Sequence, residues 1–481
     1  MSLFVVKPLD RILSESESDN LLRRSLGPVA LIMLGVGAII GAGIFTLTGV
    51  VAATNAGPAI ILSFILAAVG CVFAGLCYSE FSTMIPVAGS AYTYSYATMG
   101  ELVAWIIGWD LILEYCVGAA TVSIGWSQTL VSLLHTFGID LPPSLVASPF
   151  QPVLLADGTS IHGVINLPAV LIVVLVSLVL ILGIRESAGV NTLIVLLKIT
   201  VILVFIFLGW SYIRPSNLEP LLPPNTGAFG AFGWSGVLAG AGAIFFAYIG
   251  FDAVSTAAQE AKRPSRDMPV GIIGSLLICT ALFILYAHVL TGMVNYRELN
   301  VAAPISLALA LMHNPWISTL MNLAVLAALT SVMLVMLLGQ SRVFFSMAGD
   351  GLLPRLFGEV HPRFRTPWKC NLVLMVFVAL FAAFAPIRVV GLMTSIGTLF
   401  AFVLVCGGII IMRRTNPGLP RPFRTPWVPV VPVIGVLVNL ALMLGLGWTN
   451  WLRLLVWLAI GLVIYFAYSR FHSKIRAAGG E

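Results

Sequence analysis

Two glycine-rich stretches carry the backbone groups through which this sequence could bind a ligand. The first, LIMLGVGAIIGAGIFTLTGV at 31–50, places Gly35, Gly37, Gly41 and Gly43 within nine positions. The second, GVLAGAGAIFFAYIGFDAVSTAAQE at 236–260, places a glycine and an aspartate inside an otherwise apolar run. Glycine inside a helix costs about 0.5–1 kcal/mol relative to alanine. Each stretch therefore predicts an interrupted helix whose freed N–H and C=O groups are available as ligands.

The two ends that such an interruption creates have opposite polarity. The start of a half-helix presents N–H donors and suits a carboxylate, whereas the end of the other half presents carbonyls and suits an ammonium group. A zwitterionic amino acid matches both ends. For the first stretch alone, close helix packing through the small residues Gly37 and Gly41 is an equally good explanation. The second, similarly placed interruption favours the binding interpretation and indicates an internal repeat.

The composition places these interruptions inside a membrane. The chain has 481 residues, of which 59% are hydrophobic and only 9% charged, so lipid must be its main solvent. Freed backbone is tolerated at membrane depth only where it is buried in protein or lines a cavity. A span needs about 20 apolar residues, and the sequence predicts twelve, near 28–50, 59–84, 102–133, 164–183, 190–213, 236–258, 270–293, 316–346, 371–385, 389–412, 427–448 and 451–470.

The basic residues between these segments predict the orientation of the chain. With the N-terminus in the cytoplasm, Lys and Arg residues such as Arg11, Arg23, Arg24 and Arg185 fall inside, while Arg388 and a few others fall outside. This asymmetry predicts a multi-pass protein of the plasma (inner) membrane with both termini cytoplasmic. The basic residues therefore act as topology signals with the lipid bilayer as partner, and no nucleic-acid partner is expected.

Two ionisable residues lie deep inside predicted spans, where charge is costly and usually functional. Lys198, in GVNTLIVLLKITVILVFIFLGW, could exchange a proton with its surroundings or could be a permanently charged structural residue. Glu114, in WIIGWDLILEYCVG, could be a second proton site, a binder of a cationic substrate, or a neutral carboxyl that stabilises packing. Glu80 and Asp110 lie nearer the cytoplasmic ends and are interpreted as gate or interface residues.

Three long motifs resemble those of the amino acid, polyamine and organocation superfamily, in particular bacterial relatives of the cationic amino acid transporters. They are LGVGAIIGAGIF at 34–45, FFAYIGFDAVSTAAQEAKRPSRDMPVGI at 245–272 and GQSRVFFSMAGDGLLP at 339–354. The resemblance implies an all-α membrane protein with the leucine-transporter fold. Discontinuous helices 1 and 6 would begin a 5+5 inverted repeat, followed by two C-terminal helices. The expected parts are a tail 1–24, a first repeat 25–213, a second repeat 214–412 and a final part 413–481.

The same resemblance implies a substrate site at the two interruptions. Backbone amides near Gly41 would bind the substrate carboxylate, and carbonyls near Ile249 would bind its ammonium group. Phe246 matches an aromatic that closes over the substrate from outside, with packing as the alternative. Met336 matches a pocket-facing position where it would limit the substrate's side chain. The residues of this predicted site are Ile39, Ile40, Gly41, Ala42, Gly43, Glu114, Phe246, Ala247, Ile249 and Met336.

The resemblance also implies how transport would be driven. In proton-coupled relatives a lysine at the position of Lys198 occupies the space of a sodium ion. We therefore expect proton symport, with Lys198 in contact with the unwound part of the first span and with Thr330 or Ser331. The proton is the coupling ion, and no cofactor is expected. The six histidines show no metal-binding spacing.

These observations predict a secondary active transporter for small neutral L-amino acids such as alanine, working by alternating access. A cationic amino acid transporter or exchanger and an amino acid sensor without coupled transport are the alternatives. An intramembrane hydrolase is disfavoured because His288 is the only deep histidine and no G-x-S-x-G accompanies it. A channel is disfavoured because no repeated pore motif is present. An enzyme is therefore not expected, and the sequence does not identify a protein partner.

Overall fold

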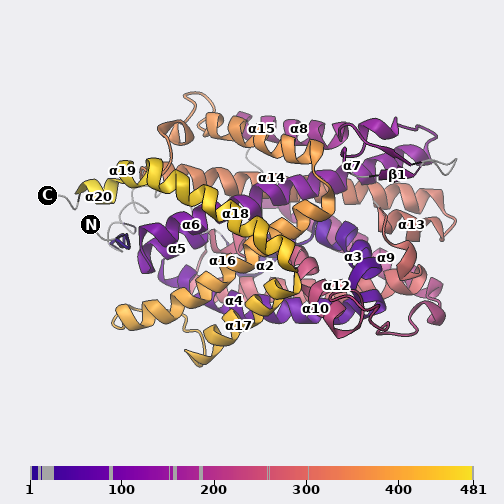
Figure 1. Ribbon diagram of the computed structural model, residues 1–481, viewed down its shortest axis with the longest axis horizontal. Helices are drawn as coiled ribbons and strands as arrows, with labels where there is room; N and C mark the ends of the chain where they lie inside the picture. Colours follow the sequence, from indigo (N-terminus) through magenta and orange to yellow (C-terminus); the bar gives the residue numbers. More distant parts are fainter. Residues whose placement is uncertain are drawn as a thin grey trace.

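The apolar segments of the sequence form a bundle of α-helices in a computed structural model of the chain (Figure 1). The structure describes residues 3–8, 12, 26–85, 90–150, 152–154, 160–183, 188–256, 258, 261–301 and 303–478. Most of the predicted tail 1–24, with Arg11, Arg23 and Arg24, lies outside these residues, as does Arg185.

The helices follow one another along almost the whole described chain. In chain order they are α2 (Pro28–Ile39), α3 (Thr48–Val51), α4 (Ile60–Met84), α5 (Ser90–Thr98), α6 (Glu101–Ile112), α7 (Gly118–Thr136), α8 (Leu167–Leu182), α9 (Ala188–Gly209), α10 (Gly233–Ile244), α11 (Ala253–Thr256), α12 (Pro264–Met293), α13 (Pro304–Ala310), α14 (Pro315–Gly349), α15 (Trp368–Phe384), α16 (Ile387–Thr415), α17 (Val430–Gly445), α18 (Trp448–Ile464), α19 (Arg470–His472) and α20 (Lys474–Ala478). Turns of π-helix at Gly43–Leu47, Ala52–Ala56, Leu113–Val117 and Tyr465–Ser469 extend several of them.

Many of these helices are long and apolar enough to cross a bilayer. Seven such helices occur among the described residues, and five shorter apolar helices accompany them, including α2, α8 and α10. This is an all-helical, multi-pass membrane protein. The helices pack in neighbouring pairs such as α4 with α12, α2 with α12, and α7 with α14. Their outward faces carry exposed leucine, valine and phenylalanine side chains, as lipid contact requires.

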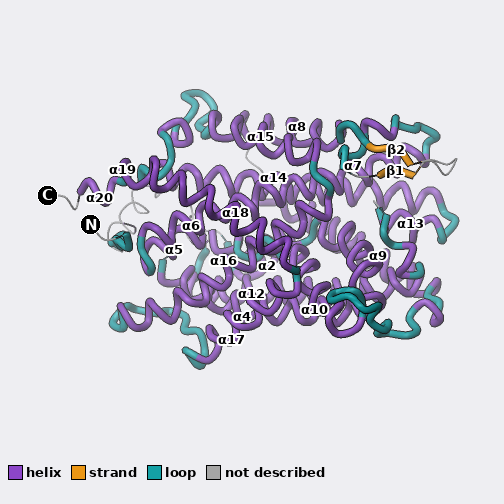
Figure 2. The backbone as a smooth tube through the Cα atoms, viewed as in Figure 1, coloured by secondary structure: helices purple, strands orange, loops and turns teal. Residues whose placement is uncertain are grey.

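The segment between the predicted spans 102–133 and 164–183 contains a short hairpin that was not predicted from the sequence. Strands β1 (Pro152–Leu154) and β2 (Ser160–His162) are antiparallel, with Val153 opposite Ile161. Figure 2 shows these two strands at the end of the bundle opposite the chain termini. Three-residue strands carry too little periodicity to be recognised in a sequence. Both termini lie together at the other end, as an even number of crossings would place them.

The chain ends are held at this end of the bundle by two buried ion pairs. The Lys7 Nζ atom lies 2.7 Å from Asp350, whose other carboxylate oxygen accepts from the Tyr92 hydroxyl at 2.8 Å. Arg476 of α20 donates through Nε to Glu101 at 2.6 Å. Burial lowers the pKa of Arg476, but the hydrogen bond and charge of Glu101 outweigh it and raise the pKa above its ordinary value. Both terminal segments are therefore anchored to the helices they cover.

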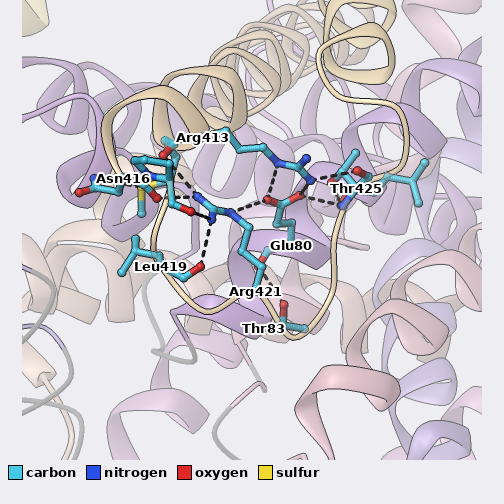
Figure 3. Close-up of polar contacts among 10 residues, drawn as sticks. Glu80, Thr83, Arg413, Asn416, Leu419, Arg421 and Thr425 are labelled. Carbon is cyan, nitrogen blue, oxygen red and sulfur yellow. Dashed lines mark hydrogen bonds and ion pairs between the residues drawn. The ribbon is translucent and has the colours of Figure 1, made fainter.

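A third buried carboxylate ties α4 to the segment between α16 and α17. Figure 3 shows Glu80 between two guanidinium groups. Arg413 donates to both its oxygens, at 3.0 and 2.7 Å, and the Nε atom of Arg421 lies 3.4 Å away. The backbone N–H of Thr425 donates to the same carboxylate at 2.7 Å. We call Glu80, Arg413, Arg421 and Thr425 the Glu80 cluster.

Candidate substrate site

The first helix is interrupted within the glycine-rich stretch of the sequence. Helix α2 ends at Ile39, Ile40 has the extended value ψ 102°, and a π-helical turn begins at Gly43. The Ile40 N–H still bonds to the Val36 carbonyl at 3.0 Å. The segment Ile40–Ala42, which we call the first break, is fully buried. Its backbone therefore lies inside the protein, as membrane depth demands.

The second interruption lies between α10 and α11. A 3-10 turn, Phe245–Tyr248, ends the first half, and Gly250 has a left-handed φ of +113° that favours glycine. The Ile249 N–H bonds to the Phe246 carbonyl at 3.3 Å. We call the segment Ile249–Asp252 the second break. Its residues are buried as well.

The two interrupted helices meet at their interruptions. A Cβ atom added to Gly250 would lie 2.8 Å from the Ala38 carbonyl oxygen, at the end of α2. One added to Gly43 would lie 2.3 Å from the Cα atom of Ala247. A residue before the first break thus faces the second break itself, and a residue after the first break faces the turn just before the second. The predicted amides of Gly41–Gly43 and the predicted carbonyls of Phe246 and Ile249 are brought to one place.

Glycine at position 43 gives a testable prediction. We expect Gly43→Ala to weaken amino acid binding about 10- to 100-fold, because the added methyl overlaps backbone rather than a movable side chain. Binding is measured as ligand-induced thermal stabilisation of the purified protein. Gly407→Ala in α16 is the matched control, since its Cβ would meet nothing within 4 Å. Equal stabilisation of both variants would contradict the close approach of the two helices.

Lys198 reaches the end of the first half-helix. Its Nζ atom donates to the Gly37 carbonyl at 2.6 Å, and the side chain is only 1% exposed. Gly37 lies in the last turn of α2, three residues before the first break. The hydroxyls of Thr330 and Ser331 donate to carbonyls of their own helix α14, those of Leu326 and Ala328. The structure thus places the lysine against α2.

Glu114 faces another carboxyl rather than a cation. It lies in the π-helical turn between α6 and α7 and is buried against Asp252 of the second break and Thr398 of α16. Asp252 accepts a hydrogen bond from the Tyr115 hydroxyl at 2.7 Å. The sequence analysis did not assign Asp252 a site role, although its position two residues after Gly250 was the available signal. The acidic pair Glu114–Asp252 therefore joins the second break to the π-helical turn Leu113–Val117, beside Thr398 of α16.

Met336 of α14 packs against Gly118, close in sequence to Glu114. Its sulfur would be 3.4 Å from a Cβ atom on Gly118, and the Thr394 methyl would lie at the same distance. Gly118 follows Glu114 by four residues, directly after the π-helical turn that contains Glu114. Met336 and Phe246 are buried, at 5% and 3% exposure. The predicted selectivity residues thus occupy the interior of the bundle.

A small cavity lies beyond the first break. It has a volume of about 60 Å³ and is lined by Leu47 and Val51 after the break, Ala243 before the second break, and Arg388 and Gly391 of α16. A volume of this size holds a few water molecules. Arg388, which is predicted to lie outside, forms part of its wall. The cavity therefore lies on the predicted outer side of the first break.

Comparison with known proteins identifies the family of this chain. The amino acid permease family matches residues 26–466. The chain is 44% identical to the branched-chain amino acid permease BcaP of Bacillus subtilis, over 98% of this chain and 99% of that protein. It is 43% identical to the methylthioribose transporter of the same organism, with the same coverage. It is 30% identical to the vacuolar cationic amino acid transporter 4 of Arabidopsis thaliana, over 99% of this chain and 97% of that protein.

These matches extend over nearly the whole chain and include both interrupted helices. They confirm the family that the three sequence motifs indicated, and they assign the chain to transport rather than to enzymatic chemistry. The chain therefore belongs to the amino acid permease family, within the amino acid, polyamine and organocation superfamily.

Proposed function

We propose that this permease couples the uptake of small neutral L-amino acids to protons by alternating access. The meeting of the two breaks, with Lys198 bonded to the turn before the first, is the observation that supports it most strongly. Freed amides and carbonyls at one place suit the two charged ends of an amino acid. A buried amine at the same place can exchange a proton as the half-helices move.

The binding mode follows from the polarity of the breaks. Amides of Gly41, Ala42 and Gly43 bind the substrate carboxylate, and carbonyls of Ile39, Phe246 and Ile249 bind its ammonium group. Ile40 and Ala247 complete the backbone of the site, and Phe246 closes it from outside. All of these residues are buried, so the protein groups replace the water that the substrate loses.

The apolar surroundings of the breaks favour a neutral substrate side chain. Met336 packs over Gly118 and limits the space available on that side. The relatives named above include a branched-chain amino acid permease and a methylthioribose transporter. Neutral substrates larger than alanine should therefore be tested as well. Leucine is accordingly compared directly with alanine.

A cationic amino acid is the second candidate substrate, because two carboxyls lie beside the second break. Glu114 and Asp252 face one another, and Asp252 also accepts a hydrogen bond from the Tyr115 hydroxyl at 2.7 Å. A long basic side chain reaching them would be stabilised electrostatically. Relatives named as cationic amino acid transporters match most of the chain.

The architecture belongs to the same proposal. Twelve spans with the leucine-transporter fold would arise from an inverted repeat of 25–213 and 214–412, with 413–481 adding two spans. The five shorter apolar helices would complete the count begun by the seven long ones. Both termini would face the cytoplasm of a cell whose plasma membrane holds the protein, with Lys- and Arg-rich segments on the same side.

Uptake into liposomes tests the function. Purified protein is reconstituted, and labelled alanine, leucine, arginine and methylthioribose are supplied with and without an inward proton gradient. We expect alanine or another neutral amino acid to accumulate and the gradient to increase its uptake about tenfold, the effect of one pH unit on a one-proton symport. Uptake of arginine alone would support the cationic candidate, whereas binding without uptake would support a sensor.

A further inference from the structure

We propose that a cavity beside the cytoplasmic end of α14 binds the phosphate-bearing headgroup of an anionic phospholipid. The cavity has a volume of about 500 Å³ and lies between the end of α14, the 3-10 turn Arg355–Gly358 and the segment joining α18 to α20. Arg355, His472 and Lys474 bring cationic or proton-accepting groups to its wall, and Phe345 and Tyr468 bring aromatic rings. This inference goes beyond amino acid transport and does not depend on it.

The charge of the cavity is not neutralised by the protein's own acids. Two carboxylates that adjoin residues of the wall in the sequence are already engaged: Asp350 with Lys7 and Tyr92, and Glu359 with Lys369. Within the ranges that the structure describes, neither Arg355 nor Lys474 has an ion-pair partner. Two cations from separate segments of the chain therefore converge on one cavity and favour an anion there. An arginine beside a lysine is a common arrangement for binding phosphate oxygens.

His472 is held in a fixed orientation at the same wall. Its Nδ1 atom lies 2.9 Å from the Tyr468 carbonyl oxygen, and its ring stacks on the Tyr468 ring with centroids 4.1 Å apart. The Nε2 atom is the remaining polar atom of the ring. The stacked ring therefore forms a fixed part of the wall and loses little rotational freedom when a ligand binds.

The shape and polarity of the cavity select a lipid over a free phosphate ion. A Cβ atom on Gly349 would meet nothing within 4 Å, so the wall recedes at the end of α14. Phe345, one turn earlier on α14, is 43% exposed, and Leu356 is 36% exposed. Exposed apolar side chains next to paired cations match a headgroup with its first acyl carbons. Basic pockets between spans on the cytoplasmic side bind anionic headgroups in this way.

The occupied cavity would also join the two segments that form it. The Lys474 N–H donates to the Asp350 carbonyl at 3.1 Å, and the Ser469 hydroxyl donates to the Leu352 carbonyl at 2.7 Å. The C-terminal segment thus already rests on the end of α14. A phosphate held by Arg355 on one side and Lys474 on the other reinforces this contact. The lipid is therefore expected to stabilise the folded protein as well as to bind it.

Lipid binding to the full-length, delipidated protein tests the proposal. Native mass spectrometry measures the affinity for phosphatidylglycerol and for phosphatidylcholine, with inorganic phosphate as a competitor. We expect phosphatidylglycerol to bind more tightly, and the double variant Arg355→Ala/Lys474→Ala to bind it roughly 30-fold more weakly, from about fivefold per cation. Gly349→Leu, which places an apolar side chain in the cavity and keeps both charges, is expected to weaken binding as well.

The matched control removes two other exposed arginines, one from the last turn of α16 and one from the segment between α16 and α17. Arg414→Ala/Arg424→Ala lowers the net charge by the same amount and leaves the cavity intact. It is expected to bind phosphatidylglycerol as the parent does. Three results would overturn the proposal. They are an equal weakening in this control, an equal affinity of the parent protein for the two lipids, and displacement of the lipid by millimolar phosphate.

Discussion

Lys198→Ala is expected to reduce proton-driven uptake about 10- to 100-fold while amino acid binding remains measurable. The size follows from the loss of one buried hydrogen bond to a charged group, which contributes about 1.5–3 kcal/mol. The lysine Nζ atom donates to the Gly37 carbonyl at 2.6 Å in the last turn before the first break. Alanine removes this donor and the ionisable amine together. The half-helix then loses the group through which a proton could act on it.

Uptake is measured in liposomes with and without an inward proton gradient, and binding is measured separately by thermal stabilisation. Lys198→Arg keeps a positive charge that cannot be released, so we expect it to bind the amino acid without responding to the gradient. Lys369→Ala is the matched control, because this lysine is partly exposed and pairs with Glu359. If uptake by Lys198→Ala still rose with the gradient, Lys198 could not be the coupling group.

The two breaks could be predicted from the sequence because their cause is local. Four glycines in nine positions weaken a helix wherever that helix lies, and the structure interrupts α2 at Ile40, inside this stretch. The same reasoning found the second interruption at Gly250. Apolar length likewise predicted the helices themselves, since a run of about 20 apolar residues has few other structures in lipid.

Contacts between distant parts of the chain could not be predicted in this way. The sequence marks Glu114 as a charge inside a span, but its neighbour Asp252 lies 138 positions later, and only the packing of the second break against the π-helical turn after α6 brings them together. Glu80 meets Arg413 across 333 positions. Lys198 could be predicted to approach the first span because the family resemblance supplied that contact; hydropathy alone gave only its depth.

The Glu80 cluster shows what such distant contacts contribute, and Glu80→Ala is expected to destabilise the protein strongly. The carboxylate is 1% exposed and holds two guanidinium groups and the Thr425 N–H. Its removal leaves two partly buried positive charges facing one another. Breaking a buried ion pair costs about 3–5 kcal/mol, so we expect the apparent Tm in detergent to fall by roughly 5–10 °C.

Glu359→Ala is the matched control, because it also removes one carboxylate from an ion pair. Glu359 and Lys369 are about half exposed, and pairs of this kind contribute about 0–1 kcal/mol. Its Tm should therefore stay close to that of the parent. Replacing Arg413 together with Glu80 removes one of the two stranded charges and should recover part of the loss. Equal Tm values for Glu80→Ala and Glu359→Ala would mean that the segment after α16 is held by other contacts, and that the Glu80 carboxylate is not what fixes it to α4.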